Sequence, residues 1–170
     1  MSIAQSLLSE FGQEKQHTRR MLEAVPEDRY DWKPHEKSMT LGYLAAHVAQ
    51  LPQWCVPACT ADELDFDPPS GVKFEVPSFS SRAEMLEAFD QFCSEAEEAV
   101  ADTSDADMMK PWTLKYQAAP LFTLPKIVVL RSIIFNHLIH HRGQLSVYLR
   151  LLDQPVPATY GPSADEQPPM

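Results

Sequence analysis

The chain has 170 residues, of which 44% are hydrophobic, and a formal net charge of −10. This length is enough for one domain with a substantial core, and the charge argues against duplex nucleic acid or an anionic membrane as the main partner. Three cysteines without a framework pattern, no signal-peptide features and no apolar run of about 20 residues predict a reduced, cytoplasmic protein without a membrane segment.

Apolar residues at helical spacing predict a first helix from about Ile3 to Val25. Glu14 and Thr18 fall on its apolar stripe and are the two exceptions to the pattern. Pro26 follows the end of this helix, and residues 26–39 are expected to form a loop with at most one short turn.

Thr40 is the predicted N-cap of a second helix, which we expect to stop before or near Pro57. The acidic, proline-containing segment 62–80 is predicted to be the longest loop. A third helix is expected to begin near Ser81, where Glu84 completes the pattern of a capping box.

Residues 102–122 are expected to be irregular, with one strand-like piece at 113–116. The fourth helix is predicted to run from Thr123 to about Asp153. With no internal repeat and no alternation long enough for a sheet, the four helices predict an all-α four-helix bundle with long crossover loops. We expect a single domain over residues 1–160, followed by an extended or disordered tail at 161–170.

The fourth predicted helix carries the strongest chemical signal. His137 and His141 are four residues apart, so both imidazoles lie on one face, within a stripe of apolar residues. Two buried rings without partners would be costly, and a divalent metal ion with a third ligand would satisfy both. His47, whose same-face neighbours in the second helix are apolar, is the best third candidate.

A set of three neutral imidazoles with open positions is typical of catalytic metal sites, and helical bundles commonly build such sites from facing helices. The alternative is that the three histidines are hydrogen-bonded core residues without a metal. The chain lacks the Glu-x-x-His pairs of di-iron carboxylate bundles, which argues against a two-metal centre.

The sequence does not decide the roles of four other polar residues. His140 points about 100° away from His141 and is expected at the edge of the site. Asn136 and Gln144 could support the ligands, although Gln144 fits a solvated position equally well. Glu14 could be an acid, a base or a fourth ligand, but a surface position is the preferred interpretation.

Cysteines and one glycine complete the candidates. Cys55 is expected in the core, Cys59 at an exposed or interfacial position, and Cys93 in the core or on the flank of its helix. Gly143 costs about 1 kcal/mol in a helix interior, which suggests close approach of another helix, for example across a dimer interface. Trp54 could form a wall of the pocket.

Three segments together resemble the DinB/YfiT-like superfamily. They are Leu41–His47 after a Trp-Lys-Pro loop, the Asn-His-x-x-His-His-Arg-Gly-Gln run at 136–144, and the segment Pro155–Asp165. The resemblance covers nearly the whole chain. It implies a four-helix bundle, often a homodimer, in which His47, His137 and His141 bind one divalent metal ion (zinc or nickel, with iron as a further option).

Characterised members of that superfamily include thiol-dependent isomerases and transferases, and the family name implies no nucleic-acid function. The resemblance therefore favours a metal-dependent thiol S-transferase that acts on an electrophilic small molecule, with a low-molecular-weight thiol as cosubstrate. A non-catalytic metal-binding or small-molecule-binding stress protein and a metal-dependent hydrolase remain as alternatives. The sequence contains no thiol-recognition motif that would choose among them.

Overall fold

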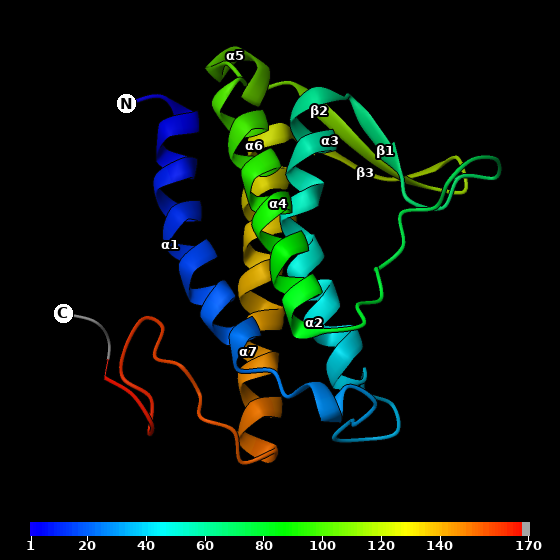
Figure 1. Ribbon diagram of the computed structural model, residues 1–170. Coiled ribbons are helices and arrows are strands. Elements are labelled where there is room, and N and C mark those ends of the chain that lie inside the picture. The colour runs from blue at the N-terminus through cyan, green and yellow to red at the C-terminus, as the bar shows by residue number, and fades with distance from the viewer. Residues whose placement is uncertain (168–170) are drawn as a thin grey trace.

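The computed structural model describes residues 1–167 and is built mainly of helices, with a small sheet beside one end of them (Figure 1). The elements are, in chain order, α1 (Ile3–Glu23), the 3₁₀ helix η1 (Glu27–Arg29), α2 (Leu41–Gln50), the 3₁₀ helix η2 (Leu51–Trp54), α3 (Cys55–Thr60), β1 (Glu63–Asp65), α4 (Arg82–Ala101), α5 (Asp105–Met108), β2 (Pro111–Tyr116), β3 (Ala119–Pro125), α6 (Lys126–Val128), the π-helix η3 (Val129–Phe135) and α7 (Asn136–Leu151). Among these residues, no helix is long and apolar enough to cross a membrane.

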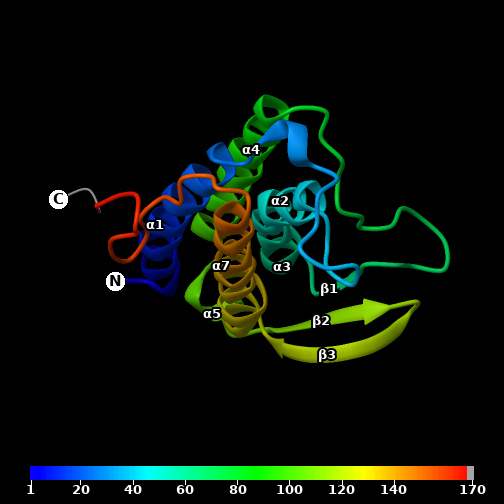
Figure 2. The same ribbon diagram turned by 90° about the horizontal axis from the view of Figure 1, so that it is seen from below.

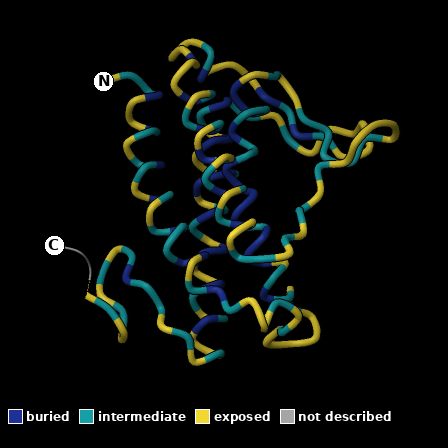
Figure 3. Tube along the Cα trace, in the orientation of Figure 1, coloured by how far each residue is buried: buried dark blue, intermediate teal, exposed yellow. Residues whose placement is uncertain are grey.

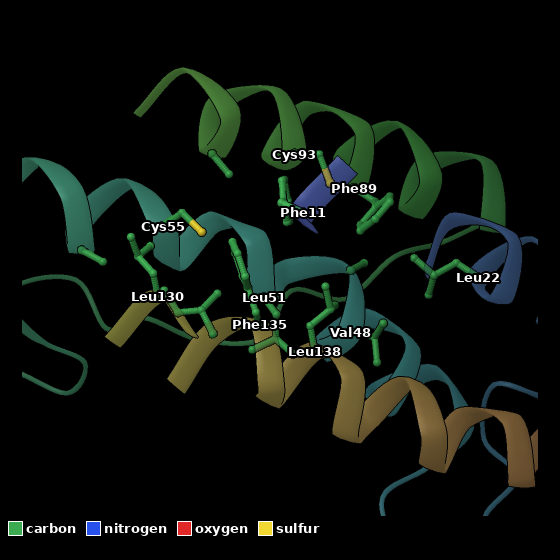
Figure 4. Packing of buried hydrophobic residues seen from close by; sticks show 14 of the residues in the cluster. Phe11, Leu22, Val48, Leu51, Cys55, Phe89, Cys93, Leu130, Phe135 and Leu138 are labelled. Atoms are coloured by element: carbon green, nitrogen blue, oxygen red, sulfur yellow. The ribbon is translucent and has the colours of Figure 1, made fainter. Parts of the chain in front are cut away.

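Four long helical segments pack side by side around one core: α1, α2 continued by η2 and α3, α4, and α6 continued by η3 and α7 (Figures 1 and 2). Their inward sides are buried, whereas the long loop after β1 and the turn between β2 and β3 are largely exposed (Figure 3). Side chains from all four segments meet in this core, among them Phe11, Leu51, Phe89, Cys93 and Phe135 (Figure 4).

The three-stranded sheet corrects the prediction of an all-α fold. Its order is β1-β2-β3, with β1 parallel and β3 antiparallel to β2. The predicted strand-like piece at 113–116 lies within β2, where Trp112 and Leu114 are buried and alternate with more exposed neighbours. That alternation spans only six residues, and the turn to β3 uses Gln117 and Ala118 at positive φ without a glycine, so the usual hairpin signal is missing.

Two helices are capped by the residues that the sequence indicated. Thr40 caps α2 by accepting a hydrogen bond from the backbone N–H of Tyr43, as predicted. Ser81 caps α4 in the same way, but the carboxylate of Glu84 accepts hydrogen bonds from Ser80 and not from the backbone of Ser81, so the capping box is only half formed.

The second helical segment ends at Thr60, near Pro57 as predicted. It passes both prolines because Pro52 and Pro57 fall in or next to the first turns of η2 and α3, where a missing N–H is tolerated. One predicted boundary was wrong. The last segment begins at Lys126, because Thr123 pairs with Thr113 in the sheet.

The segment after α7 contains no helix or strand up to residue 167 and lies beside α1 (Figure 2). Arg20 on α1 forms an ion pair with Glu166, and Arg150 on α7 forms one with Asp165. Residues 168–170 of the predicted tail lie outside the described residues.

Candidate metal centre

The three predicted ligands meet between α2 and α7. The Nε2 atoms of His47 and His137 are 3.4 Å apart, and those of His137 and His141 are 2.8 Å apart. One ring nitrogen from each histidine lies within 4.8 Å of the other two, so the group could hold a metal ion. His141 is buried, and the other two rings are half-buried. His47 and His137 are 90 residues apart in the chain. A local sequence pattern therefore showed only the i, i+4 pair of His137 and His141.

Hydrogen bonds to the other ring nitrogens orient two of these histidines. The Nδ1 of His141 is 2.7 Å from Oε1 of Gln144, an atom that can only accept, so Nδ1 carries the proton. His137 hydrogen-bonds the backbone of Ile133, and this contact raises its pKa, as expected for a ring that donates to a carbonyl.

The Nε2 atoms of His137 and His141 face each other at 2.8 Å, so a cation placed beside them could be bound by both rings. All three nitrogens lie within 4.8 Å of one another, and neutral imidazoles are ordinary ligands of zinc, so the three side chains fit a divalent ion.

Burial keeps these imidazoles neutral. It lowers the pKa of His47 to about 4 and that of His137 to about 4, with a further contribution from the neighbouring histidines. Burial also lowers the pKa of His141. Neutral imidazole is the form that ligates metals, so near pH 7 no proton has to be displaced from these rings. The Nδ1 of His47 is buried and has no hydrogen-bond partner within residues 1–167, so its ring lacks the orienting contact that the other two have.

Gln144 connects His141 to His140. Its Oε1 accepts from His141, and its Nε2 lies 3.1 Å from Nε2 of His140, which is exposed at the edge of the site. The structure therefore favours the supporting role of Gln144 over the solvated alternative. Asn136 is exposed and makes no side-chain hydrogen bond among the described residues.

Glu14 is neither at the metal centre nor on the surface, which corrects the preferred sequence interpretation. It is 5% exposed and forms a buried ion pair with Arg142, at 2.6 Å. Arg142 also donates to the hydroxyls of Thr18 and Tyr160, and the Tyr160 hydroxyl donates to Glu14. The signal for this network was the pair of polar residues on the apolar stripe of α1, Glu14 and Thr18, whose partner Arg142 directly follows a predicted ligand.

The cysteines are not part of the site either. Cys55 and Cys93 are in the core, as expected for Cys55 and as one of the two positions expected for Cys93, but Cys59 is buried as well, not exposed. Burial raises the pKa of all three thiols. None of them belongs to the group of residues that could hold the metal ion.

Comparisons with known proteins agree with the resemblance seen in the sequence. The model of the DinB family matches residues 1–169. A solved DinB-like protein from Bacillus cereus is similar with a TM-score of 0.68 and 21% identity, over 92% of this chain and 97% of that one. A DinB-like protein from Bacillus subtilis has a TM-score of 0.68 and 16% identity, over 91% and 96% of the two chains. No curated protein matches this sequence. At these identities, the solved structures establish the fold.

Proposed function

The chain belongs to the DinB family, and from that premise we propose that His47, His137 and His141 bind one divalent metal ion in a metal-dependent thiol S-transferase. The observation that carries the metal site is the convergence of three rings: one ring nitrogen of each lies within 4.8 Å of the other two, and the Nε2 atoms of His137 and His141 are 2.8 Å apart. We also propose that the four long helical segments form the four-helix bundle of a single domain, residues 1–160.

The reaction would join the sulfur of a low-molecular-weight thiol to an electrophilic carbon of a small molecule. The thiol proton would pass to water, and the electron pair of the broken bond would leave with the departing group. A divalent ion held by three neutral imidazoles keeps its positive charge and supplies a lowered pKa to a bound thiol or water. Zinc suits imidazole and thiolate ligands alike, and nickel and iron are alternatives.

The residues of this chain would orient the ligands and would leave the thiol to be supplied from outside. Gln144 and the Ile133 carbonyl direct the Nε2 atoms of His141 and His137 toward the same point. The thiols of Cys55, Cys59 and Cys93 are buried with raised pKa values, so none is suited to act as the nucleophile.

Elemental analysis of protein purified without chelator tests the metal site. We expect about one equivalent of zinc, nickel or iron in the parent chain and little in His141→Ala. His35→Ala is the matched control, because His35 is an exposed loop residue outside the three-histidine group. A parent chain that carries no metal and cannot be reconstituted would contradict the proposal, as would equal loss of metal from both variants.

Assays of the metal-loaded protein then separate the reaction types. Turnover of an electrophile such as a haloaromatic compound only in the presence of added thiol supports the transferase. Turnover of an ester without thiol indicates a hydrolase. Metal binding without turnover of any thiol and electrophile pair indicates a binding protein and contradicts the catalytic part of the proposal.

A further inference from the structure

A cleft of about 360 Å³ lies between α7 and the end of the loop that precedes α2, and one of its lining residues, Gln144, hydrogen-bonds His141. It is lined by Gln144, Val147 and Tyr148 on α7 and by Lys37, Ser38 and Met39 on the loop. This volume is at the lower end of the range for small-molecule sites.

The cleft and the metal centre share one face of α7. His137, His141, Gln144 and Tyr148 follow each other at spacings of three and four residues, so they form one stripe along the helix. Gln144 belongs to both, because it hydrogen-bonds His141 and lines the cleft. Tyr148 lies seven residues beyond His141, which is about 10 Å along the helix axis.

Three of the six lining residues, Met39, Val147 and Tyr148, give the cleft an apolar part, and two contacts of Tyr148 hold it in position. The Tyr148 hydroxyl donates to the Met39 carbonyl at 3.3 Å, which ties the loop to α7. The ring of Trp32 packs edge-on against Tyr148 with centroids 5.7 Å apart. Val147 is 57% exposed and Met39 is 38% exposed, so apolar surface is available to a ligand.

The positive charge of Lys37, one of the residues that line the cleft, favours an anionic ligand. Lys37 makes no ion pair with any of residues 1–167, although the chain as a whole has a net charge of −10. The neighbouring Lys33 differs, because its ammonium group donates to the Glu36 carbonyl and does not line the cleft. A free ammonium group beside an apolar cleft attracts an anionic group on a ligand with an apolar body.

We propose that this cleft binds a small organic carboxylate, with its carboxylate at Lys37, its apolar body against Met39, Val147 and Tyr148, and its reactive end at the three histidines. The location of the reactive end rests on the proposed metal-dependent function. The carboxylate belongs either to the electrophile or to the thiol, since both would extend from the histidines along the same stripe.

Binding of hexanoate to the metal-free protein tests the cleft without the metal. In ¹H–¹⁵N spectra, we expect hexanoate to shift the Gln144 side-chain amide and the Trp32 indole signals, and to bind about fivefold more tightly than hexan-1-ol, which lacks the charge. Lys37→Gln should remove this preference, whereas Lys33→Gln should retain it. Equal binding of acid and alcohol, or equal behaviour of the two variants, would overturn the proposal.

The cobalt-substituted protein identifies which reactant carries the carboxylate. If it is the thiol, 6-mercaptohexanoate should produce a sulfur-to-cobalt charge-transfer band at lower concentration than 6-mercaptohexan-1-ol, and only in chains that retain Lys37. If it is the electrophile, hexanoate should bind without removing the band of 2-mercaptoethanol. Failure of cobalt to bind would contradict the metal site and leave the hexanoate result standing, whereas cobalt binding without any carboxylate preference would overturn the cleft alone.

Discussion

Gln144 is the residue on which the orientation of His141 depends. Its Oε1 accepts from Nδ1 of His141, and its own position is set by the contact with His140. Because partners of metal-bound histidines typically contribute 10–100-fold to metal affinity, we expect Gln144→Ala to weaken metal binding about 10-fold without changing the stoichiometry. Competition with a chelator of known affinity measures this change.

Gln16→Ala is the matched control, since Gln16 is an exposed glutamine on α1 that makes no side-chain hydrogen bond within the described chain. An unchanged affinity in Gln144→Ala would show that His141 is held by packing alone.

The three cysteines provide a second prediction at the residue scale. Burial raises their pKa values, so the thiolate fraction in the folded protein stays small from pH 7 to pH 9, where a free thiol with a pKa near 8.5 ionises. We expect reaction with a disulfide reagent at pH 8 to be far slower than that of glutathione. In denaturant, all three should react at the rate of a free thiol. One fast-reacting cysteine in the folded state would reopen the possibility of a nucleophile within the chain.

At the scale of elements, the Glu14–Arg142 pair fixes α7 against α1. Both side chains are buried, with 5% and 3% of their surfaces exposed. Removal of one partner strands the other charge in the core, so Glu14→Leu should lower the free energy of unfolding by about 3–5 kcal/mol. The double variant Glu14→Leu with Arg142→Met should recover much of this loss, because an apolar pair has no stranded charge. Urea denaturation monitored by circular dichroism measures both.

Arg131 and Glu10 form the matched control for this pair, since they also join the last helical segment to α1 but are more exposed. Arg131→Met should change the free energy of unfolding by less than about 1 kcal/mol. Equal effects of Glu14→Leu and Arg131→Met would show that burial does not govern the contribution of the Glu14–Arg142 pair.

Two glycines test helix packing. An added Cβ at Gly143 would meet nothing within 4 Å, so Gly143→Ala should raise the free energy of unfolding by about 0.8–1 kcal/mol through helix propensity. An added Cβ at Gly42 would lie 3.0 Å from Cβ of Tyr30, so Gly42→Ala should be destabilising. Thermal melts at several protein concentrations measure these changes. A destabilising, concentration-dependent effect of Gly143→Ala would indicate that a second copy of the chain covers this surface, which is one reason suggested from the sequence for a glycine here.

At the scale of the whole molecule, the features that could be predicted from the sequence are those that depend on residues close together in one helix. The stripe through His137 and His141 and the caps at Thr40 and Ser81 depend on residues within one or two turns of each other, so they are visible without tertiary information. His47 was found by its apolar neighbours and by the family resemblance. Its distance to His137 depends on how two helices 90 residues apart pack together.

The features that were missed depend on tertiary contacts. β3 forms because β2 is available to pair with it, and the two overlap the predicted irregular segment and the start of the predicted fourth helix. The π-helical stretch Val129–Phe135 immediately precedes α7, and this rare type of helix is not indicated by the spacing of apolar residues. The burial of Glu14 is explained only by Arg142 and Tyr160, which reach it from positions 128 and 146 residues away.

The proposed metal centre would join α2 to α7, so metal should stabilise the fold as a whole. An ion that binds only the folded chain at 100 times its dissociation constant adds about 2.7 kcal/mol to the free energy of unfolding. For a chain of this length, this corresponds to an increase in Tm of about 5–10 °C. Differential scanning calorimetry of chelator-treated protein, with and without added zinc, measures the shift, and His35→Ala should show the same shift as the parent.

His47→Ala separates a link between helices from a site within one helix. His137 and His141 remain on α7 in this variant, and a metal ion held by them alone would constrain one helix without joining it to another. Because the proposed site needs the ligand from α2, we expect His47→Ala to lose most of the zinc-dependent increase in Tm. An undiminished increase would place the metal on α7 alone. The three-histidine centre would then be contradicted even if elemental analysis found one equivalent of metal.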